Sequence, residues 1–495
     1  MNNLASKLIQ NCKKMPNKIC LIQKDKKVTY KELHNLVSNF KDYLEKQGIE
    51  KGQKVLVLVP MSIELYVTLL AIWAIGAIPC FMDAGFIKSG MNKNDFDNIN
   101  AVIGITKYIL YSNINKNLRK LKIKVNVNNI VNLNDNELEI AEVEENFSAI
   151  LTYTSGTTGK PKIATRTHEF LEYQGEILEK TINYEDTDIE ISSVPIFTLS
   201  NINVGITTVI ADGNFSDLGK SNPEKIVNQI ITEKVNRVMA APGLLNVITD
   251  YCIKNKIELK DVKKIFTGGG AIFIDFIKRL KKVFPKAQIV TLYGSTEAEP
   301  IAELNVNEIT EDDLEKIRNG YGILAGNIVG VEDCKTIKTG IKEIGSLTKE
   351  EFESLQQEIG EIVVAGKNVL KGYLNGVGDK ENKFSVNGEK YHRTGDLGVF
   401  DNQGRLWLRG RIKEPYFNIE AALHARFNIG KTAVFEHEGK IILVLENNNI
   451  REKDIKDAIT FEKIDEIKYI NKIPVDKRHS TKVNYKELKK KLKIG

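Results

Sequence analysis

Leu151 to His168 reads LTYTSGTTGKPKIATRTH, and the interpretation of the whole chain starts from this stretch. A strand-like run, Ala149 to Thr152, leads into a segment dense in Ser, Thr and Gly that ends in two lysines. Glycine lets the backbone adopt conformations closed to other residues and lets an anion approach main-chain N–H groups. The stretch therefore predicts a phosphate-binding loop after a strand. An exposed polar hairpin is the alternative.

The predicted loop offers hydroxyl and ammonium donors that suit the β- and γ-phosphates of a nucleotide. Its proposed ligands are Thr154, Ser155, Gly156, Thr157, Thr158, Gly159, Lys160 and Lys162. The Walker pattern G-x-x-x-x-G-K-[ST] has no match anywhere in the chain. An ATPase built on that motif is therefore excluded.

The composition of the chain limits the number of domains, the kinds of partner and the state of the thiols. A chain of 495 residues, 42% of them hydrophobic, predicts two to four packed units. The 71 basic and 65 acidic residues leave a net charge of only +6, which gives no reason to expect nucleic-acid binding. The five cysteines form no C-x-x-C pair, so reduced thiols in a cytoplasmic protein are expected.

Helical and strand-like segments alternate over most of the chain. An amphipathic stretch, Tyr30 to Gln47, precedes a buried strand, Lys54 to Val59. The apolar run Leu65 to Met82 contains Gly76 and Pro79, so we expect a buried helix that turns into a strand and no integral membrane segment. Further strand candidates are Ala101 to Ile105, Ile189 to Val194, Arg237 to Met239, Lys264 to Thr267 and Ile289 to Leu292. This alternation predicts an α/β protein with largely parallel sheets.

The pattern changes toward the C-terminus. Shorter, Gly-punctuated strand signals between residues 322 and 407 predict a β-rich subdomain. After Gly410 and Arg411, strand and helix signals return, with a buried strand at Ile441 to Leu445 and a docked amphipathic helix from Tyr485 to Lys493. We therefore expect an N-terminal domain of residues 1–411 and a C-terminal α+β domain of residues 412–495.

Four further motifs follow the loop in a fixed order. They are Tyr293-Gly294-Ser295-Thr296-Glu297, Thr394-Gly395-Asp396, Gly410-Arg411 and Lys482. With these motifs the chain resembles, over essentially its whole length, the acyl-adenylate-forming superfamily, which includes acyl-CoA synthetases, peptide-synthetase adenylation domains and firefly luciferase. The resemblance implies a large N-terminal domain and a small mobile C-terminal lid, with Lys413 at the hinge.

Joining a carboxylate to ATP requires positioning and charge stabilisation more than covalent chemistry. Glu297 suits Mg²⁺, which prefers oxygen ligands and takes one or two carboxylates besides phosphate oxygens. Thr296 suits a phosphate oxygen, and Asp396, supported by Arg411, suits the ribose hydroxyls. The alternatives are a solvated acid for Glu297, a turn residue for Asp396 and a salt-bridge partner for Arg411.

The resemblance implies the same roles and adds two more. It places the adenine between the Tyr293-Gly294-Ser295 segment and the turn that contains Gly269, Gly270 and Ala271. It also implies that Lys482 reaches the acyl and phosphate oxygens during adenylation, where an ammonium neutralises developing charge. A solvated lysine in a lysine-rich tail is the alternative for Lys482.

Departures from the family pattern concern the acyl group and its acceptor. The hinge runs almost directly into PYFNIEAALHA, so the glycine that lines a phosphopantetheine tunnel has no clear counterpart. Thr198 stands where many acyl-CoA synthetases have a histidine, and no aspartate is placed to hold an α-amine, which makes an amino acid a less favoured substrate. The acyl pocket is expected near Phe197, Asn201, Gly205, Gly268 and Ala298.

Local segments such as PIFTLSN, YGSTEAEP and DKRHSTK resemble the olefin-biosynthesis β-lactone synthetases and related natural-product acyl-AMP ligases. We expect an enzyme of natural-product or fatty-acid metabolism that uses Mg²⁺ and ATP to convert a carboxylic acid to its acyl-AMP, releasing pyrophosphate. The acyl group would then pass to the thiol of a carrier protein or CoA. Closure of a β-lactone by the substrate's own hydroxyl, and a non-catalytic nucleotide-binding regulatory module, are the alternatives.

Overall fold

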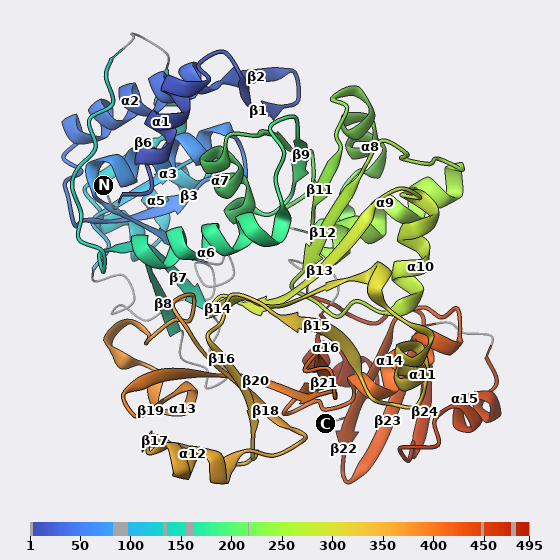
Figure 1. The fold of residues 1–495 in the computed structure, drawn as a ribbon. Helices are drawn as coiled ribbons and strands as arrows, with labels where there is room; N and C mark the ends of the chain where they lie inside the picture. The colour runs from blue at the N-terminus through green and yellow to red at the C-terminus, as the bar shows by residue number, and fades with distance from the viewer. Residues whose placement is uncertain are drawn as a thin grey trace. The chain divides into compact units, whose positions relative to one another are not determined.

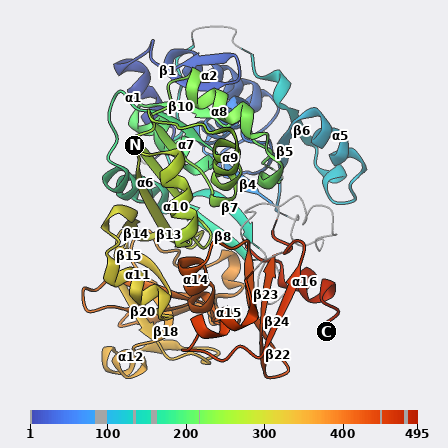
Figure 2. The ribbon, with the colours of Figure 1, turned by 90° about the vertical axis from the view of Figure 1, so that its right-hand side faces the viewer.

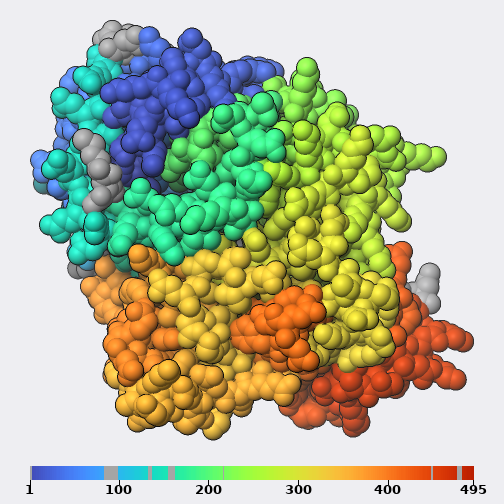
Figure 3. All heavy atoms as spheres, in the orientation of Figure 1, coloured from blue at the N-terminus to red at the C-terminus, as the bar shows by residue number. Residues whose placement is uncertain are grey.

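The computed structural model describes residues 3–82, 98–131, 136–154, 162–215, 217–446, 450–476 and 482–494. The chain forms two compact units (Figure 1). Unit 1 comprises residues 1–211 and 370–380, and unit 2 comprises residues 212–369 and 381–495. Side chains fill the gaps that the ribbon leaves within each unit on the face seen in Figure 3.

Unit 1 contains a six-stranded sheet of order β6-β5-β3-β4-β7-β8. Its strands are β3 (Lys54–Leu58), β4 (Ile78–Phe81), β5 (Ala101–Gly104), β6 (Ile123–Asn126), β7 (Ser148–Thr154) and β8 (Lys162–Thr167). All neighbours are parallel except β7 and β8. The apolar run before β4 forms the buried helix α3 (Ile63–Ile75), which ends at Gly76 with φ of 77°, so the predicted helix-to-strand turn is confirmed.

A second set of strands in unit 1 has the order β9-β10-β1-β2. These strands are β1 (Ile19–Gln23), β2 (Lys26–Thr29), β9 (Ile189–Ser192) and β10 (Thr207–Ile210). Among its described residues, this unit also contains the α-helices α1 (Ser6–Lys14), α2 (Tyr30–Lys46), α5 (Thr106–Ile114), α6 (His168–Ile182) and α7 (Pro195–Val204). The predicted helix after β2 and the strands at β3, β5 and β9 are thus confirmed.

Helix α2 begins with a capping box. The Glu32 N–H donates to Thr29 Oγ1 at 3.2 Å, and the Thr29 N–H donates to Glu32 Oε2 at 2.7 Å. Replacing Thr29 by alanine removes one of these bonds and is expected to cost about 1 kcal/mol, or about 2–4 °C in the melting temperature of a unit this size. Differential scanning calorimetry measures the shift, and Thr29→Ser, which keeps the hydroxyl, is the matched control. An equal shift in both variants would contradict a capping role.

The first part of unit 2 continues the α/β alternation. Strands β11 (Arg237–Met239), β12 (Lys264–Gly268) and β13 (Gln288–Ser295) are parallel neighbours, as the sequence predicted. Helices α8 (Pro223–Thr232), α9 (Pro242–Asn255) and α10 (Ile274–Val283) lie on one side of these strands in both ribbon views (Figures 1 and 2). Because the strands are parallel, their carboxyl ends meet at one edge, where binding loops commonly gather.

The sheet of unit 2 then becomes antiparallel, in the order β16-β18-β20-β21-β15-β14-β13. Its strands are β14 (Ala298–Asn305), β15 (Ile323–Ile328), β16 (Asp333–Ile337), β18 (Gly360–Ala365), β20 (Glu389–Phe400) and β21 (Leu406–Arg411), with β17 (Gly345–Leu347) and β19 (Lys383–Val386) paired beside β20. Helices α11 (Glu311–Arg318), α12 (Lys349–Leu355) and α13 (Asp379–Asn382) connect them. This confirms the β-rich character predicted for residues 322–407.

The last part of unit 2 has its own small core (lower right in Figure 1). Strands β22 (Thr432–His437), β23 (Lys440–Glu446) and β24 (Glu466–Ile470) form a sheet flanked by α14 (Phe417–Arg426), α15 (Glu452–Ala458) and α16 (Tyr485–Lys491). Leu488 of α16 is fully buried against this sheet, so the docked terminal helix is confirmed. The domain boundary at residue 412 stays a prediction.

Helix α14 also packs against α10 and α11 within unit 2. The Phe273 and His424 rings stack with centroids 4.3 Å apart, and His424 Nδ1 lies 3.1 Å from Asp275 Oδ1. Arg426 Nη2 donates to the Arg318 carbonyl at 3.0 Å. These contacts bring residues 417–426 against the α/β part of the unit and close one side of the cavity described below.

Two global expectations concern thiols and membranes. All five cysteines are free thiols, and four of them are buried, which agrees with the expected reduced state. In the described ranges, none of the helices has both the length and the apolar character needed to span a bilayer.

Candidate active site

The predicted phosphate loop joins two neighbouring antiparallel strands. Residues 155–161 lie outside the described residues, and with them the predicted ligands Ser155, Gly156, Thr157, Thr158, Gly159 and Lys160. Thr154 ends β7, Lys162 begins β8, and the two residues pair in the strand register. Strands β7 and β8 are therefore antiparallel neighbours, an arrangement that both interpretations of the sequence allow.

Lys162 is only 5% exposed, and its surroundings include a residue that the sequence did not single out. Its Nζ lies 5.3 Å from the centre of the Tyr373 ring. Tyr373 bridges to Ala164 of β8, and the Tyr373 N–H donates to Asp379 Oδ1 at 2.8 Å. Sequence reasoning missed Tyr373 because it lies far from Lys162 along the chain and belongs to none of the motifs quoted above.

In unit 2, three of the predicted residues form a hydrogen-bonded group. The Tyr293 hydroxyl donates to Asp396 Oδ2 at 2.8 Å, and Arg411 Nε lies 2.8 Å from Asp396 Oδ1. Asp396 lies within β20, directly opposite Arg411 in β21, so the alternative that it occupies a turn is wrong. The neighbouring antiparallel strands β20 and β21 therefore hold Asp396 and Arg411 side by side on one sheet.

The electrostatics of this group follow from burial. The Asp396 side chain is 16% exposed, and desolvation raises the pKa of its carboxyl group, opposed by Arg411, the Tyr293 hydrogen bond and Lys482. Burial, with the adjacent Asp396 charge, also raises the pKa of Tyr293 well above its usual value. Tyr293 is therefore a protonated hydrogen-bond donor at neutral pH.

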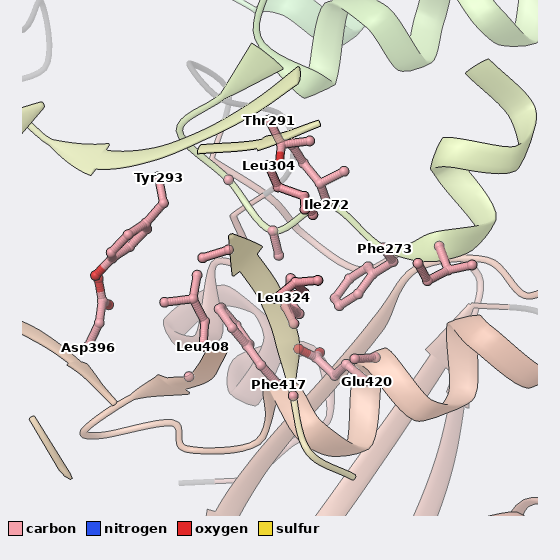
Figure 4. Close-up of a pocket in the computed structure, with 18 of the residues that line it drawn as sticks. Ile272, Phe273, Thr291, Tyr293, Leu304, Leu324, Asp396, Leu408, Phe417 and Glu420 are labelled. Atoms are coloured by element: carbon pink, nitrogen blue, oxygen red, sulfur yellow. The ribbon is translucent and has the colours of Figure 1, made fainter. Parts of the chain in front are cut away.

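Asp396 opens onto a cavity of about 340 Å³ within unit 2 (Figure 4). Its walls come from β12–α10, β13, β15, β21, α14 and the start of α16. The predicted site residues that line it are Gly269, Gly270, Ala271, Tyr293, Gly294, Asp396, Arg411 and Lys482. The structure thus brings together the predicted adenine segments, the predicted ribose acid and the predicted lid lysine.

Glycines permit the close approach of the backbone segments on one side of this cavity. A Cβ on Gly268 would lie 2.4 Å from the Leu292 carbonyl oxygen, so no larger residue fits between β12 and β13 there. Gly269 follows with φ of +84°, in the left-handed region that glycine favours. The chain can therefore turn sharply and expose its backbone to the cavity.

The predicted magnesium ligand lies on the turn between β13 and β14. Ser295 pairs with Ala298, which leaves Thr296 and Glu297 at the tip, and the Glu297 N–H donates to Ser295 Oγ at 3.3 Å. Over the described ranges, no three acidic, histidine or cysteine side chains cluster to hold a metal by themselves. One carboxylate on a turn fits Mg²⁺ that takes its other ligands from phosphates and water.

The residues predicted near the acyl group are largely packed. Asn201 is buried in α7, where its Nδ2 donates to Glu190 Oε1 at 2.7 Å and to Thr208 Oγ1 at 3.0 Å. Phe197 is 4% exposed, and a Cβ on Gly205 would lie 2.9 Å from the Met15 side chain. Ala298 is fully buried in unit 2. Their role toward an acyl group stays a prediction.

The hinge prediction falls on a tight turn. The Arg411 N–H donates to the Glu414 carbonyl at 3.1 Å, and Lys413 lies exposed between them. Strand β21 ends at Arg411 and α14 begins at Phe417, so only residues 412–416 connect them. The connection is as short as the sequence indicated, and the hinge role of Lys413 stays a prediction.

A comparison with protein-family models assigns the chain to a family. Residues 8–374 match the model described as AMP-binding enzyme. The chain belongs to the AMP-binding enzyme family. This confirms the resemblance drawn from the five ordered motifs, and it identifies the protein as an enzyme related to the acyl-adenylate-forming ligases.

The sequence identity to individual relatives is low. The chain is 25% identical over 417 residues to an olefin beta-lactone synthetase of Xanthomonas campestris pv. campestris, covering 78% of this chain and 72% of that protein. It is 23% identical to 4-coumarate-CoA ligase 1 of Narcissus pseudonarcissus, covering 99% and 93%.

Solved structures agree on the fold. O-succinylbenzoate Coenzyme A Synthetase (MenE) from Bacillus subtilis in complex with AMP matches with a TM-score of 0.75 at 19% identity, covering 98% of both chains. ATP-bound MatB from Rhodopseudomonas palustris matches with a TM-score of 0.78 at 17% identity, covering 99% of both. These likenesses confirm the predicted α/β fold with a smaller C-terminal domain.

Proposed function

We propose that this enzyme activates a carboxylic acid with ATP, forming an acyl-AMP and pyrophosphate, and then passes the acyl group to a phosphopantetheine thiol of CoA or a carrier protein. The observation that carries the proposal is the cavity in which Asp396, Tyr293, Arg411 and Lys482 converge. Family membership supports the same reaction class. We further propose that the protein acts in the cytoplasm.

In the first step, a carboxylate oxygen of the substrate forms a bond to the α-phosphorus of ATP while the bond to pyrophosphate breaks. Asp396 would accept hydrogen bonds from the ribose hydroxyls, with Arg411 and Tyr293 holding its carboxylate in place. Glu297 would hold Mg²⁺ together with phosphate oxygens, and the ion supplies charge neutralisation on the leaving group. Lys162 is proposed to bind the phosphates from β8 of unit 1.

Lys482 supplies the mobile positive charge. It lines the cavity and lowers the pKa of Asp396, so its ammonium acts on the same space as the proposed ribose site. We propose that it neutralises charge that develops on the α-phosphate and acyl oxygens. In this proposal residues 412–495 are a lid that turns about Lys413 and withdraws Lys482 after adenylation.

A second candidate function is β-lactone formation. A β-hydroxyl of the substrate would attack the acyl carbon of the acyl-AMP, closing a four-membered ring and releasing AMP. The short connection of residues 412–416 supports it, since it leaves little chain to line a thiol tunnel. The similarity to an olefin beta-lactone synthetase points the same way.

Pyrophosphate release from Mg·ATP, measured across fatty, β-hydroxy, aromatic and amino acids, tests both candidates. Mass spectrometry identifies the product as acyl-AMP, as a thioester when CoA or a phosphopantetheinylated carrier protein is added, or as a β-lactone. Release with one class of acid names the substrate. If every acid fails while AMP still binds, the protein is a nucleotide-binding regulatory module and the proposal is wrong.

Tyr373 offers a test of the phosphate-binding role of Lys162. Replacing Tyr373 by leucine removes the ring that faces the Lys162 ammonium, so the KM for ATP is expected to rise about fivefold, the equivalent of roughly 1 kcal/mol for a desolvated cation–π contact. Tyr373→Phe keeps the ring and is expected to stay within about twofold of the native enzyme. Steady-state kinetics at varied ATP measure both. Equal effects of the two substitutions would show that the ring face does not position Lys162.

A further inference from the structure

Residues 98–131 of unit 1 concentrate the positive charge of the chain. This segment contains six basic residues and no acidic residue, so its charge equals the net charge of +6 of the whole protein. Such a one-sided segment is unusual in a chain whose 71 basic and 65 acidic residues otherwise balance. Five of its six cations are exposed to solvent: Lys107, Lys116, Arg119, Lys120 and Lys122.

Helix α5 adds two exposed apolar side chains to this charge. Leu110 is 63% exposed and Ile114 is 76% exposed. Residues three and four apart are neighbours on a helix surface, so both side chains share one face of α5 with Lys107. The other side of the helix already packs against the core of unit 1, through Tyr108, Ile109 and Tyr111. The outward face of α5 is therefore apolar and flanked by cations, a combination that marks interaction surfaces.

The surroundings of α5 leave this face open. The helix packs against β5, the edge strand β6 and the short 3-10 helix η2 (Leu118–Lys120). Figure 2 shows α5 and β6 at the rim of unit 1. These three neighbours all lie within residues 98–131, so none of them carries an acid that would neutralise the cations. We call the five exposed cations, together with Leu110 and Ile114, the basic–apolar patch.

We propose that the basic–apolar patch docks the protein on an anionic lipid surface. The cations attract negatively charged headgroups, and Leu110 and Ile114 enter the boundary between headgroups and acyl chains. A protein partner fits this surface less well, because protein interfaces are depleted in lysine and enriched in aromatic side chains. Four of the five exposed cations are lysines, and the patch contains no aromatic residue. Docking is independent of the proposed reaction and of the acid that is activated.

The number of cations sets the expected strength of docking. Each Lys or Arg close to an anionic membrane raises the affinity by about fivefold. Salt screens exposed charges, so this contribution falls as the ionic strength rises. Two apolar side chains alone bury too little surface to hold a protein on neutral lipid. Docking is therefore expected to require anionic lipid and to be reversed by salt.

Co-sedimentation with lipid vesicles measures docking without requiring turnover. Vesicles of phosphatidylcholine that contain phosphatidylglycerol are compared with vesicles of phosphatidylcholine alone. The native protein is expected to bind the anionic vesicles at least about tenfold more tightly than the neutral ones. High salt is expected to release it from the anionic vesicles.

A double substitution tests the charges of the patch. Arg119→Gln combined with Lys120→Gln is expected to weaken binding to the anionic vesicles by about 30-fold, the product of two cations at about fivefold each. The matched control is Lys281→Gln combined with Lys282→Gln, which removes an adjacent exposed pair from α10. The control is expected to stay within about twofold of the native protein, because cations outside the docking surface are screened from the lipid.

A second double substitution tests the apolar side chains. Leu110→Gln combined with Ile114→Gln is expected to weaken binding by at least about tenfold, because the two side chains would no longer gain by leaving water. Ile231→Gln combined with Ile253→Gln, at exposed positions of α8 and α9, is the matched control and is expected to change binding by less than about twofold. All four positions are exposed, so the variants are expected to fold, which circular dichroism verifies.

Three results would overturn the proposal. The first is a native protein that does not sediment with the anionic vesicles. The second is an equal loss of binding in either patch variant and its matched control. The third is a native protein that ignores vesicles but binds polyglutamate through Arg119 and Lys120, which would identify the partner as an acidic protein. Weaker binding in the charge variant with no change in the Leu110 and Ile114 variant would refute insertion of α5 into the lipid.

Discussion

Replacing Lys482 by alanine is expected to lower the rate of pyrophosphate release by about 10²–10³-fold, the usual effect of removing one preorganised group that stabilises transition-state charge. Lys482 is exposed at the start of the segment that leads into α16 and also lines the cavity, so its loss removes charge without opening the core. Stopped-flow or coupled pyrophosphate assays at saturating ATP and acid measure the effect. AMP affinity is expected to change far less than the rate.

The tail offers a matched control for this substitution. Lys486 is an exposed lysine of α16, so Lys486→Ala removes the same charge at nearly the same place in the sequence. It is expected to leave the rate unchanged, because surface charges contribute little. If Lys486→Ala and Lys482→Ala slow the reaction equally, the lysine-rich tail acts as a whole and the specific role of Lys482 is wrong.

Asp396→Ala is expected to weaken AMP binding by about 30–100-fold. A ribose would lose its carboxylate acceptor, and hydrogen bonds to charged groups contribute about 1.5–3 kcal/mol. The substitution also leaves the buried Tyr293 hydroxyl and the Arg411 guanidinium without the partner that they share in the structure. Isothermal titration calorimetry with AMP measures the loss, and circular dichroism verifies that β20 and β21 remain folded.

The substitution Tyr293→Phe tests how much of the AMP affinity depends on the hydrogen bond that Tyr293 donates to Asp396. It deletes one hydrogen bond to Asp396 and keeps the ring, so a loss of only about two- to tenfold is expected. If Asp396→Ala binds AMP as well as the native protein does, Asp396 has a purely structural role on the sheet. The proposed ribose site would then have to lie elsewhere in the cavity.

Local patterns explain why much of the architecture was predictable. The apolar run 65–82 became α3 and β4 because Gly76 permits a left-handed helix end, and both elements are buried. Strand β3 and helix α2 follow from apolar run length and helical periodicity, which depend only on neighbouring residues. The family followed from the order of five short motifs along the chain.

Contacts between residues far apart in the sequence could not be predicted from such local patterns. Asp396 read equally well as a turn residue, and only the pairing of β20 with β21 set it against Arg411 inside a strand. Tyr373 gave no signal, because its ring meets Lys162 through a bridge between segments far apart in the sequence. Glu420 is not among the predicted site residues, and only the packing of α14 against α10 places it in the wall of the cavity.

The sequence by itself therefore determined the order of the secondary-structure elements, the family and the residue types available for nucleotide chemistry, because periodicity, turn residues and motifs are local properties. The tertiary structure alone decided which of those side chains share a cavity, which carboxyl groups are buried and which arginine pairs with Asp396. Those properties depend on strand register and helix packing between distant segments, and burial raises the pKa of the Glu420 and Asp396 carboxyl groups above the ordinary values.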